Sequence, residues 1–180
     1  EIYIHIPFCI KKCSYCDFLS APATEQTVES YMAALFAEIE GKSGKYRDRR
    51  VVSVFIGGGT PSRLTGEQMG QLMACIRRHF SLDPAAEITT EVNPGTVSEE
   101  KLRTFRKAGI NRLSIGMQSA QDEELRELGR IHDFAGFLEA YEAAVQAGYT
   151  NINVDVMSGL PGQTLESLRD TLGKLLALRP

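Results

Sequence analysis

The chain has 180 residues, of which 43% are hydrophobic and 24% are charged. This balance is typical of a globular domain and excludes a disordered, collagen-like or coiled-coil chain. The net charge of -3 gives no support to nucleic-acid binding, and no apolar run approaches the roughly 20 residues that span a bilayer. We therefore expect neither a nucleic-acid partner nor an integral membrane segment.

Strand-like and helix-like patterns alternate along the chain. Each of five short runs rich in Ile and Val is followed, after a loop, by a longer segment with apolar residues three and four apart. This alternation predicts an α/β fold of five βα units whose strands form a parallel sheet. No low-complexity linker interrupts the pattern, so we expect residues 1–180 to form one domain. The predicted strands are residues 2–6, 51–56, 87–92, 112–115 and 150–156.

The two faces of the predicted strands differ in polarity. Successive side chains point to opposite faces, so Ile4 lies on an apolar face of the first strand and Tyr3 on a more polar one. Parallel strands covered by helices on both faces read as nearly continuous apolar runs, which these strands do not. A partial (β/α)6-type barrel, with helices outside and polar side chains inside, explains the division better. Glu91, Gln118 and Asp155 lie late in their strands or just after them, where barrels gather functional groups.

Three of the four cysteines follow the first strand in the pattern C-x3-C-x2-C. Cys9, Cys13 and Cys16 lie in CIKKCSYC, and thiolates select iron–sulfur clusters, zinc or copper(I). If a [4Fe–4S] cluster binds here, one iron lacks a protein thiolate and is open to a small-molecule ligand. The alternatives are a zinc site with His5 as fourth ligand and thiols that hold no metal. Cys75 lies beside an apolar helical stripe, and we expect it to fill the core.

A run of glycines follows the second predicted strand, in GGGTPS at residues 57–62. Successive glycines let backbone N–H groups approach a ligand, and a tight strand-to-helix turn is the simpler alternative. Arg130, in LGRIH, either reaches a ligand carboxylate or lies exposed in its loop. His79 and His132 have no evident partner, and we expect both at the surface.

Together these segments resemble a known family. YIHIPFCIKKCSYCDF is similar to the opening of radical S-adenosylmethionine (SAM) enzymes. GGGTPS, TTEVNPG, LSIGMQS, LGRIH and LPGQT resemble the oxygen-independent coproporphyrinogen III oxidase group within them, so the resemblance covers essentially the whole chain. It implies a [4Fe–4S] cluster on Cys9, Cys13 and Cys16, whose remaining iron binds the amino and carboxylate groups of SAM.

The resemblance also implies further contacts to SAM. Gly58, Gly59 and Thr60 would hold its methionine end. Four of the remaining six residues lie on the polar strand face described above, so the strand pattern and the resemblance agree independently. These six are Tyr3, Tyr15, Glu91, Gln118, Arg130 and Asp155.

One position distinguishes two subfamilies of this group. The oxidases carry another cysteine two positions after the third, whereas this chain has Phe18 there, in CDF. The CDF ending resembles the heme chaperone subfamily, which is thought to bind heme and pass it to acceptor proteins. We therefore expect a heme chaperone rather than an enzyme that decarboxylates coproporphyrinogen III to protoporphyrinogen IX.

The two ends of the sequence indicate part of a longer protein. Glu1 runs straight into an apolar segment, and Pro180 follows a helical pattern. The resemblance implies a sixth βα unit and a smaller carboxyl-terminal domain, neither of which these residues contain, so heme-binding residues are not named. No leader pattern precedes the first strand, which favours the cytoplasm. The resemblance further implies an electron donor and leaves a homodimer open.

Overall fold

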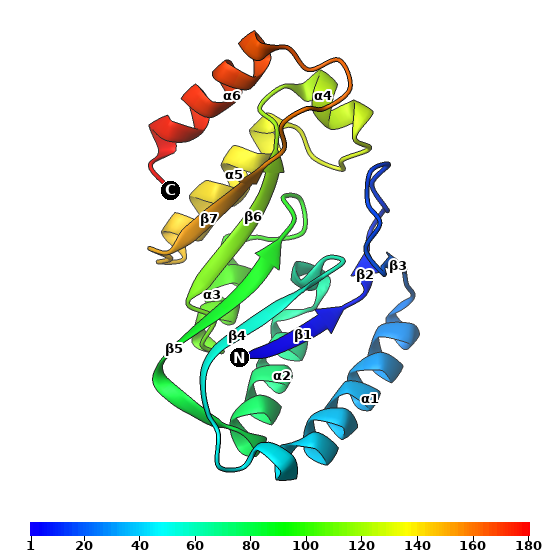
Figure 1. The fold of residues 1–180 in the computed structure, drawn as a ribbon, viewed down its shortest axis with the longest axis vertical. Coiled ribbons are helices and arrows are strands. Elements are labelled where there is room, and N and C mark those ends of the chain that lie inside the picture. Colours follow the sequence, from blue (N-terminus) through cyan, green and yellow to red (C-terminus); the bar gives the residue numbers. More distant parts are fainter.

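In a computed structural model, residues 1–180 form a curved parallel sheet with helices packed along it (Figure 1). The strand order β1-β4-β5-β6-β7 follows the chain and never reverses, whereas a doubly wound sheet reverses at a switch point. With right-handed crossovers, an unreversed order places the connecting helices on one face of the sheet. The predicted partial barrel of five βα units is confirmed. Its strands are β1 (Ile2–Ile6), β4 (Arg50–Gly58), β5 (Ser81–Val92), β6 (Arg112–Gln118) and β7 (Ile152–Val156).

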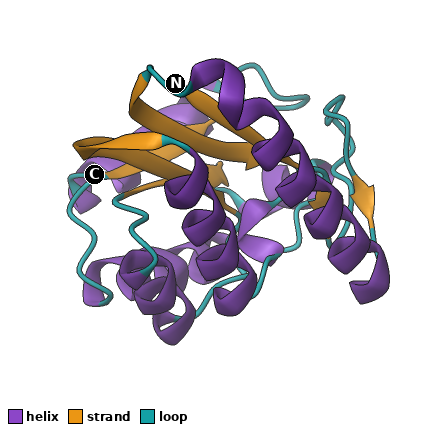
Figure 2. Cartoon of the chain, turned by 90° about the horizontal axis from the view of Figure 1, so that it is seen from below, coloured by secondary structure: helices purple, strands orange, loops and turns teal.

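The connections between strands carry the helices, which form a layer against the sheet in Figure 2. Thr65 caps α2 by accepting a hydrogen bond from the backbone N–H of Gln68, whose side chain accepts one from the Thr65 N–H. A cap of this kind contributes about 1 kcal/mol to helix stability. The helices are α1 (Glu25–Ser43), α2 (Gly66–His79), α3 (Glu99–Lys107), α4 (Asp122–Glu127), α5 (Phe134–Gln146) and α6 (Leu165–Leu178), with short 3-10 helices η1 (Gly44–Tyr46) and η2 (Pro61–Arg63).

The hydrophobic core lies between the outer face of the sheet and these helices. Ile6 and Ile56 on the strands are fully buried, as are Leu72 and Ile76 on α2. Each buried side chain of this size stabilises the fold by about 2 kcal/mol. Cys75 is partly buried and packs against the same core, as expected for a core-filling residue. None of the helices has the length and hydropathy needed to span a bilayer.

The structure extends the predicted strands and adds two short ones. β5 begins at Ser81 because its first residues pair with β4 before a register shift between Val51 and Ser53. β6 continues to Gln118, where a second register shift precedes the end of its pairing with β7. β2 (Phe8–Cys9) and β3 (Ala21–Pro22) pair in parallel. This small sheet closes the base of the loop that carries Cys13 and Cys16.

Candidate functional site

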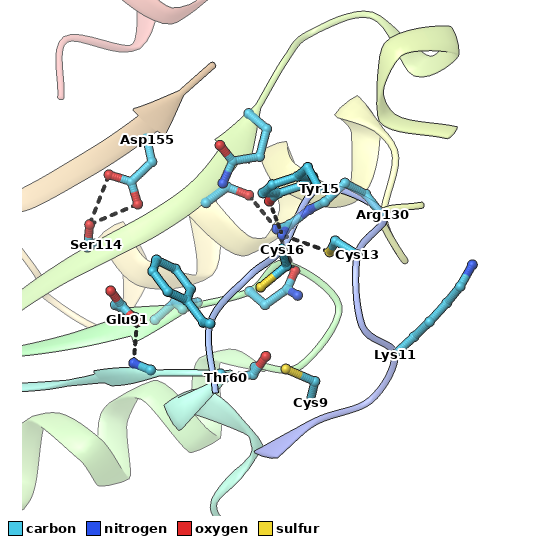
Figure 3. Close-up of a pocket in the computed structure, with 17 residues that line it drawn as sticks. Cys9, Lys11, Cys13, Tyr15, Cys16, Thr60, Glu91, Ser114, Arg130 and Asp155 are labelled. Carbon is cyan, nitrogen blue, oxygen red and sulfur yellow. Dashed lines mark hydrogen bonds between the residues drawn. The ribbon is translucent and has the colours of Figure 1, made fainter. Parts of the chain in front are cut away.

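A cavity that is partly open to solvent lies at the carboxyl ends of the strands (Figure 3). It is bounded by the loop after β1, by the ends of β4, β5 and β6, and by β7. Of the residues that the sequence analysis assigns to a site, only Tyr3 does not line it. Those that line it are Cys9, Cys13, Cys16, Tyr15, Gly58, Gly59, Thr60, Glu91, Gln118, Arg130 and Asp155.

The three cysteines of the motif are free thiols that face this one cavity. Cys9 is buried, whereas Cys13 and Cys16 are partly exposed. The loop that carries them is anchored near its tip, because the Ser14 N–H donates a 3.0 Å hydrogen bond to the Leu128 carbonyl. Three unpaired thiols on one wall of a cavity, with no fourth cysteine beside them, fit a cluster that leaves one iron for another ligand.

The arrangement does not favour the zinc alternative. His5 uses both ring nitrogens, since Nε2 lies 2.9 Å from the Leu19 carbonyl oxygen and Nδ1 lies 3.0 Å from the Tyr3 hydroxyl. His5 therefore holds the end of the cysteine loop against β1 rather than completing a tetrahedral metal site.

Arg130 points into the cavity and connects four segments of the chain. Its Nη2 donates to the Gly116 carbonyl at 2.8 Å and to the Asn93 side-chain oxygen at 2.9 Å. Its Nη1 lies 3.4 Å from the Tyr15 hydroxyl and 3.7 Å from the Cys13 sulfur. The guanidinium can therefore compensate the negative charge of a thiolate or of a ligand carboxylate. The sequence left open whether Arg130 faces a ligand site or lies exposed in its loop, and the structure places it at the cavity.

Two carboxylates, Glu91 and Asp155, lie on the strand side of the cavity, opposite the cysteine loop (Figure 3). Burial raises the pKa of Glu91, and the negative charge of Asp155 adds to the rise, although a hydrogen bond from Gly58 and the nearby His5 oppose it. Ser114 donates to both carboxylate oxygens of Asp155, at 3.2 and 3.1 Å. A ligand with a positive charge and hydroxyl groups would relieve this repulsion and satisfy both carboxylates.

The glycine run serves close packing rather than anion binding. The Gly58 N–H donates to Glu91, and the Gly59 N–H donates to the Ile6 carbonyl at 2.8 Å, so neither is free for a ligand. A Cβ at residue 59 would lie 3.0 Å from the Cys9 sulfur, and one at residue 58 would lie 2.7 Å from the His5 ring. Gly58 also has a φ of +119°, which favours glycine. These two N–H groups are therefore engaged within the protein, and the turn lets β4 pass against the cysteine loop. A contact between Gly58, Gly59 or Thr60 and SAM stays a prediction.

Tyr3 lies on the same face of the sheet but away from the cavity. Its ring is 57% exposed and stacks on Phe55, with 6.2 Å between the ring centroids. Tyr3 lies early in β1, two residues before His5, so its side chain sits below the carboxyl end of the sheet. A contact between Tyr3 and SAM stays a prediction.

The expectation that His132 lies at the surface is wrong. Only 9% of this residue is exposed, and its Nε2 lies 3.4 Å from the Met117 carbonyl oxygen. Burial lowers the pKa of His132 to about 4, and the positive charge of Arg130 adds to this effect. The loop after α4 folds inward to bring Arg130 into the cavity, and His132 is buried with it. His79 is partly exposed.

Sequence reasoning missed six lining residues. Ser114 and Gly116 lie on the polar face of β6, and Asn93 directly follows β5, so the alternation that identified Glu91 and Asp155 could have found them. Phe18 was considered only as a subfamily marker, and its ring is 66% exposed at the cavity. The other two missed lining residues are Lys11 and Val92.

Comparison with known sequences gives consistent matches. Residues 3–175 match the family described as the Radical SAM superfamily. "Heme chaperone HemW" of Escherichia coli is 41% identical over 181 residues, which cover 100% of this chain and 48% of that protein. "Heme chaperone HemW" of Haemophilus influenzae is 40% identical, with the same coverage of each chain. The chain thus spans about half the length of the curated relatives it matches.

Solved structures share the fold. Coproporphyrinogen III oxidase (HemN) from Escherichia coli, described as a radical SAM enzyme, matches with a TM-score of 0.92 and 35% identity. The match covers 99% of this chain and 42% of that one. Methylornithine synthase (PylB) matches with a TM-score of 0.68 at 17% identity, over 99% of this chain and 50% of that one, and shows the fold alone.

Proposed function

Because this chain belongs to the radical SAM superfamily, we propose that it is the core domain of a heme chaperone that carries a [4Fe–4S] cluster and SAM. The superfamily implies both cofactors. The observation that carries the proposal is the group of three free thiols facing the same cavity as two carboxylates and one arginine. A bound cluster of this kind supplies single electrons for reductive cleavage of a sulfonium.

The residues of the cavity divide into two groups by their chemistry. Cys9, Cys13 and Cys16 hold the cluster, while Arg130 supplies positive charge beside Cys13. On the opposite side, Glu91 and Asp155 present negative charge to the amine, sulfonium or ribose hydroxyls of SAM. Further cavity residues that we assign to SAM are Tyr15 on the cysteine loop, Gln118 at the end of β6, and Gly58, Gly59 and Thr60 at or just after the end of β4.

Heme carriage is supported by two observations. The relatives that match over the whole chain at about 40% identity are named heme chaperones. Phe18 stands where the oxidases of this group have another cysteine, so an exposed apolar ring replaces a thiol at the rim of the cavity. The protein would then bind heme and transfer it to acceptor proteins, with heme as cargo.

A coproporphyrinogen III oxidase is the alternative, and the match to HemN from Escherichia coli favours it. That activity removes carbon dioxide from two propionates of coproporphyrinogen III after radical abstraction. It needs an electron donor, as would cleavage of SAM in the chaperone. For both functions we place the protein in the cytoplasm, where the reducing environment keeps Cys9, Cys13 and Cys16 free.

The test begins with anaerobic reconstitution of the protein with iron and sulfide. Iron and sulfide analysis, the [4Fe–4S] absorbance and SAM binding report on the cofactors, and heme titration followed by transfer to an apo heme protein reports on carriage. Bound heme that moves to the acceptor supports the chaperone. Stoichiometric protoporphyrinogen formed with SAM and a reductant would instead identify the oxidase. Protein without iron and without affinity for SAM would overturn both.

A further inference from the structure

Arg63, at the end of η2, connects both ends of the cysteine loop. Its Nη1 donates to the carbonyl oxygen of Cys9 at 3.2 Å, and its Nη2 donates to the carbonyl oxygen of Ala23. The side chain is partly buried and takes part in no ion pair. The hydrogen bonds of the Arg63 side chain are therefore all with the backbone on the two sides of the loop.

The two carbonyls flank the small sheet that closes this loop. Phe8 pairs with Ala21 and Cys9 with Pro22, and the Ala21 N–H donates to the Pro7 carbonyl at 3.0 Å. Two residues per strand make a weak pairing by themselves. Arg63 adds a charged, planar pair of donors that spans both strands, which a single-point donor such as lysine cannot reproduce.

The positions of the three thiols depend on this base. The Cys9 sulfur packs beside Gly59, and the Cys9 carbonyl is held by Arg63, so this cysteine is fixed to the segment after β4. Cys13 and Cys16 lie on the loop beyond the base. Inside that loop, Lys12 donates to the Phe18 carbonyl at 3.1 Å, and Ser14 holds the tip to Leu128. If the base opened, Cys13 and Cys16 would lose their alignment with Cys9.

We propose that Arg63 is a positioning residue that holds the cysteine loop in the conformation that accepts the cluster. The inference rests on the proposed function. Arg63 touches neither the cluster nor SAM in this role, since it lies at the base of the loop and does not line the cavity. Its effect is to order the three thiols before iron binds, so that cluster assembly does not have to order them.

The experiment compares Arg63→Met, Arg63→Lys and the control Arg47→Met, which alters an exposed arginine outside the cavity. Clusters are assembled anaerobically, and their loss to an iron chelator is followed by absorbance. Amide hydrogen exchange of residues 8–23 is measured in the cluster-free proteins. We expect Arg63→Met, which removes two charge-assisted hydrogen bonds, to accelerate both processes by about tenfold or more. Arg63→Lys should lie between that variant and wild type, and Arg47→Met should match wild type.

Wild-type rates of exchange and chelation in Arg63→Met would overturn the role of Arg63. If Arg63→Met does not fold, Arg63→Lys provides the test. Wild-type rates of exchange and chelation in Arg63→Lys would show that the two-point contact of the guanidinium is not required. The two proposals fail separately. A wild-type protein that assembles no cluster refutes the proposed function, while exchange in the cluster-free proteins still decides whether Arg63 orders the loop.

Discussion

The backbone N–H of Gly58, at the end of β4, donates a 2.9 Å hydrogen bond to Oε2 of Glu91, near the end of β5. The bond joins neighbouring strands at the rim of the cavity and leaves the second carboxylate oxygen for another partner. Burial and the nearby Asp155 charge raise the pKa of Glu91, so the free carboxylate gains from a cationic ligand.

Replacement of Glu91 should therefore weaken SAM binding without affecting the cluster. Glu91→Gln keeps the size of the side chain but removes the charge, and we expect SAM affinity to fall about tenfold, as for the loss of one charged hydrogen bond. Calorimetric titration of the cluster-loaded protein measures this. Glu87→Gln, on the exposed part of the same strand, is the matched control. Equal SAM affinity in Glu91→Gln and wild type would show that Glu91 has only a structural role.

Loss of one motif cysteine should prevent cluster assembly. Cys13→Ala leaves two of the three thiols that line the cavity, too few to hold the cluster against a chelator. Iron and sulfide analysis after anaerobic reconstitution gives the measure, with Cys75→Ala as a control that keeps all three. A complete brown [4Fe–4S] spectrum in Cys13→Ala would refute the ligand assignment.

His132 should make the protein less stable in mild acid. The folded state lowers the pKa of His132 from 6.5 to about 4, so between these values the unfolded chain binds a proton that the folded chain does not. We expect His132 to reduce the free energy of unfolding by about 3 kcal/mol as the pH falls from 6.5 to 4. Urea denaturation across this range measures the slope.

The controls isolate this contribution from other titrating groups. His132→Gln keeps a donor for the Met117 carbonyl and removes the titration, so its stability should depend less on pH than that of wild type. His79→Gln, on the partly exposed end of α2, is the control for removing an imidazole elsewhere in the chain. Identical slopes in His132→Gln and wild type would show that His132 is not held neutral.

Gln118 is one of two non-glycine residues with a positive φ, at 68°. Such a conformation costs about 1 kcal/mol or more, and β-branched residues tolerate it least. We expect Gln118→Gly to keep wild-type stability within about 1 kcal/mol while weakening SAM binding. Gln118→Val should lose both stability and SAM binding. Thermal denaturation and SAM titration distinguish these outcomes. Wild-type stability in Gln118→Val would contradict the inference that the backbone at residue 118 is strained.

The strand pattern predicted the cavity because it depends on local geometry. Alternation placed Glu91 and Asp155 on the inner face, and parallel strands bring their carboxyl ends together whatever their spacing in the sequence. The alternation did not distinguish Tyr3 from Glu91 and Asp155. It identifies the face of the sheet on which a side chain lies, but not the position of that side chain along the strand. The position of Tyr3 relative to Glu91 depends on the register of β1 with β4 and β5.

Contacts between distant segments could not be predicted. Arg63 reaches the Cys9 carbonyl across a sequence separation of 54, and no periodic pattern relates the two residues. His132 is buried because Arg130 turns the loop inward, where it contacts Asn93, directly after β5. The register shift that precedes Gln118 likewise depends on the pairing of β6 with β7.

The pleat of the strands also separates two kinds of evolutionary change. Residues that hold the wall together point outward into the helices, and residues that meet a ligand point inward from the same backbone. A lineage can therefore exchange inner side chains, and with them the molecule that is recognised, while its folding remains intact. On this basis, a rim position such as Phe18 can change without disturbing the buried residues that face the helices.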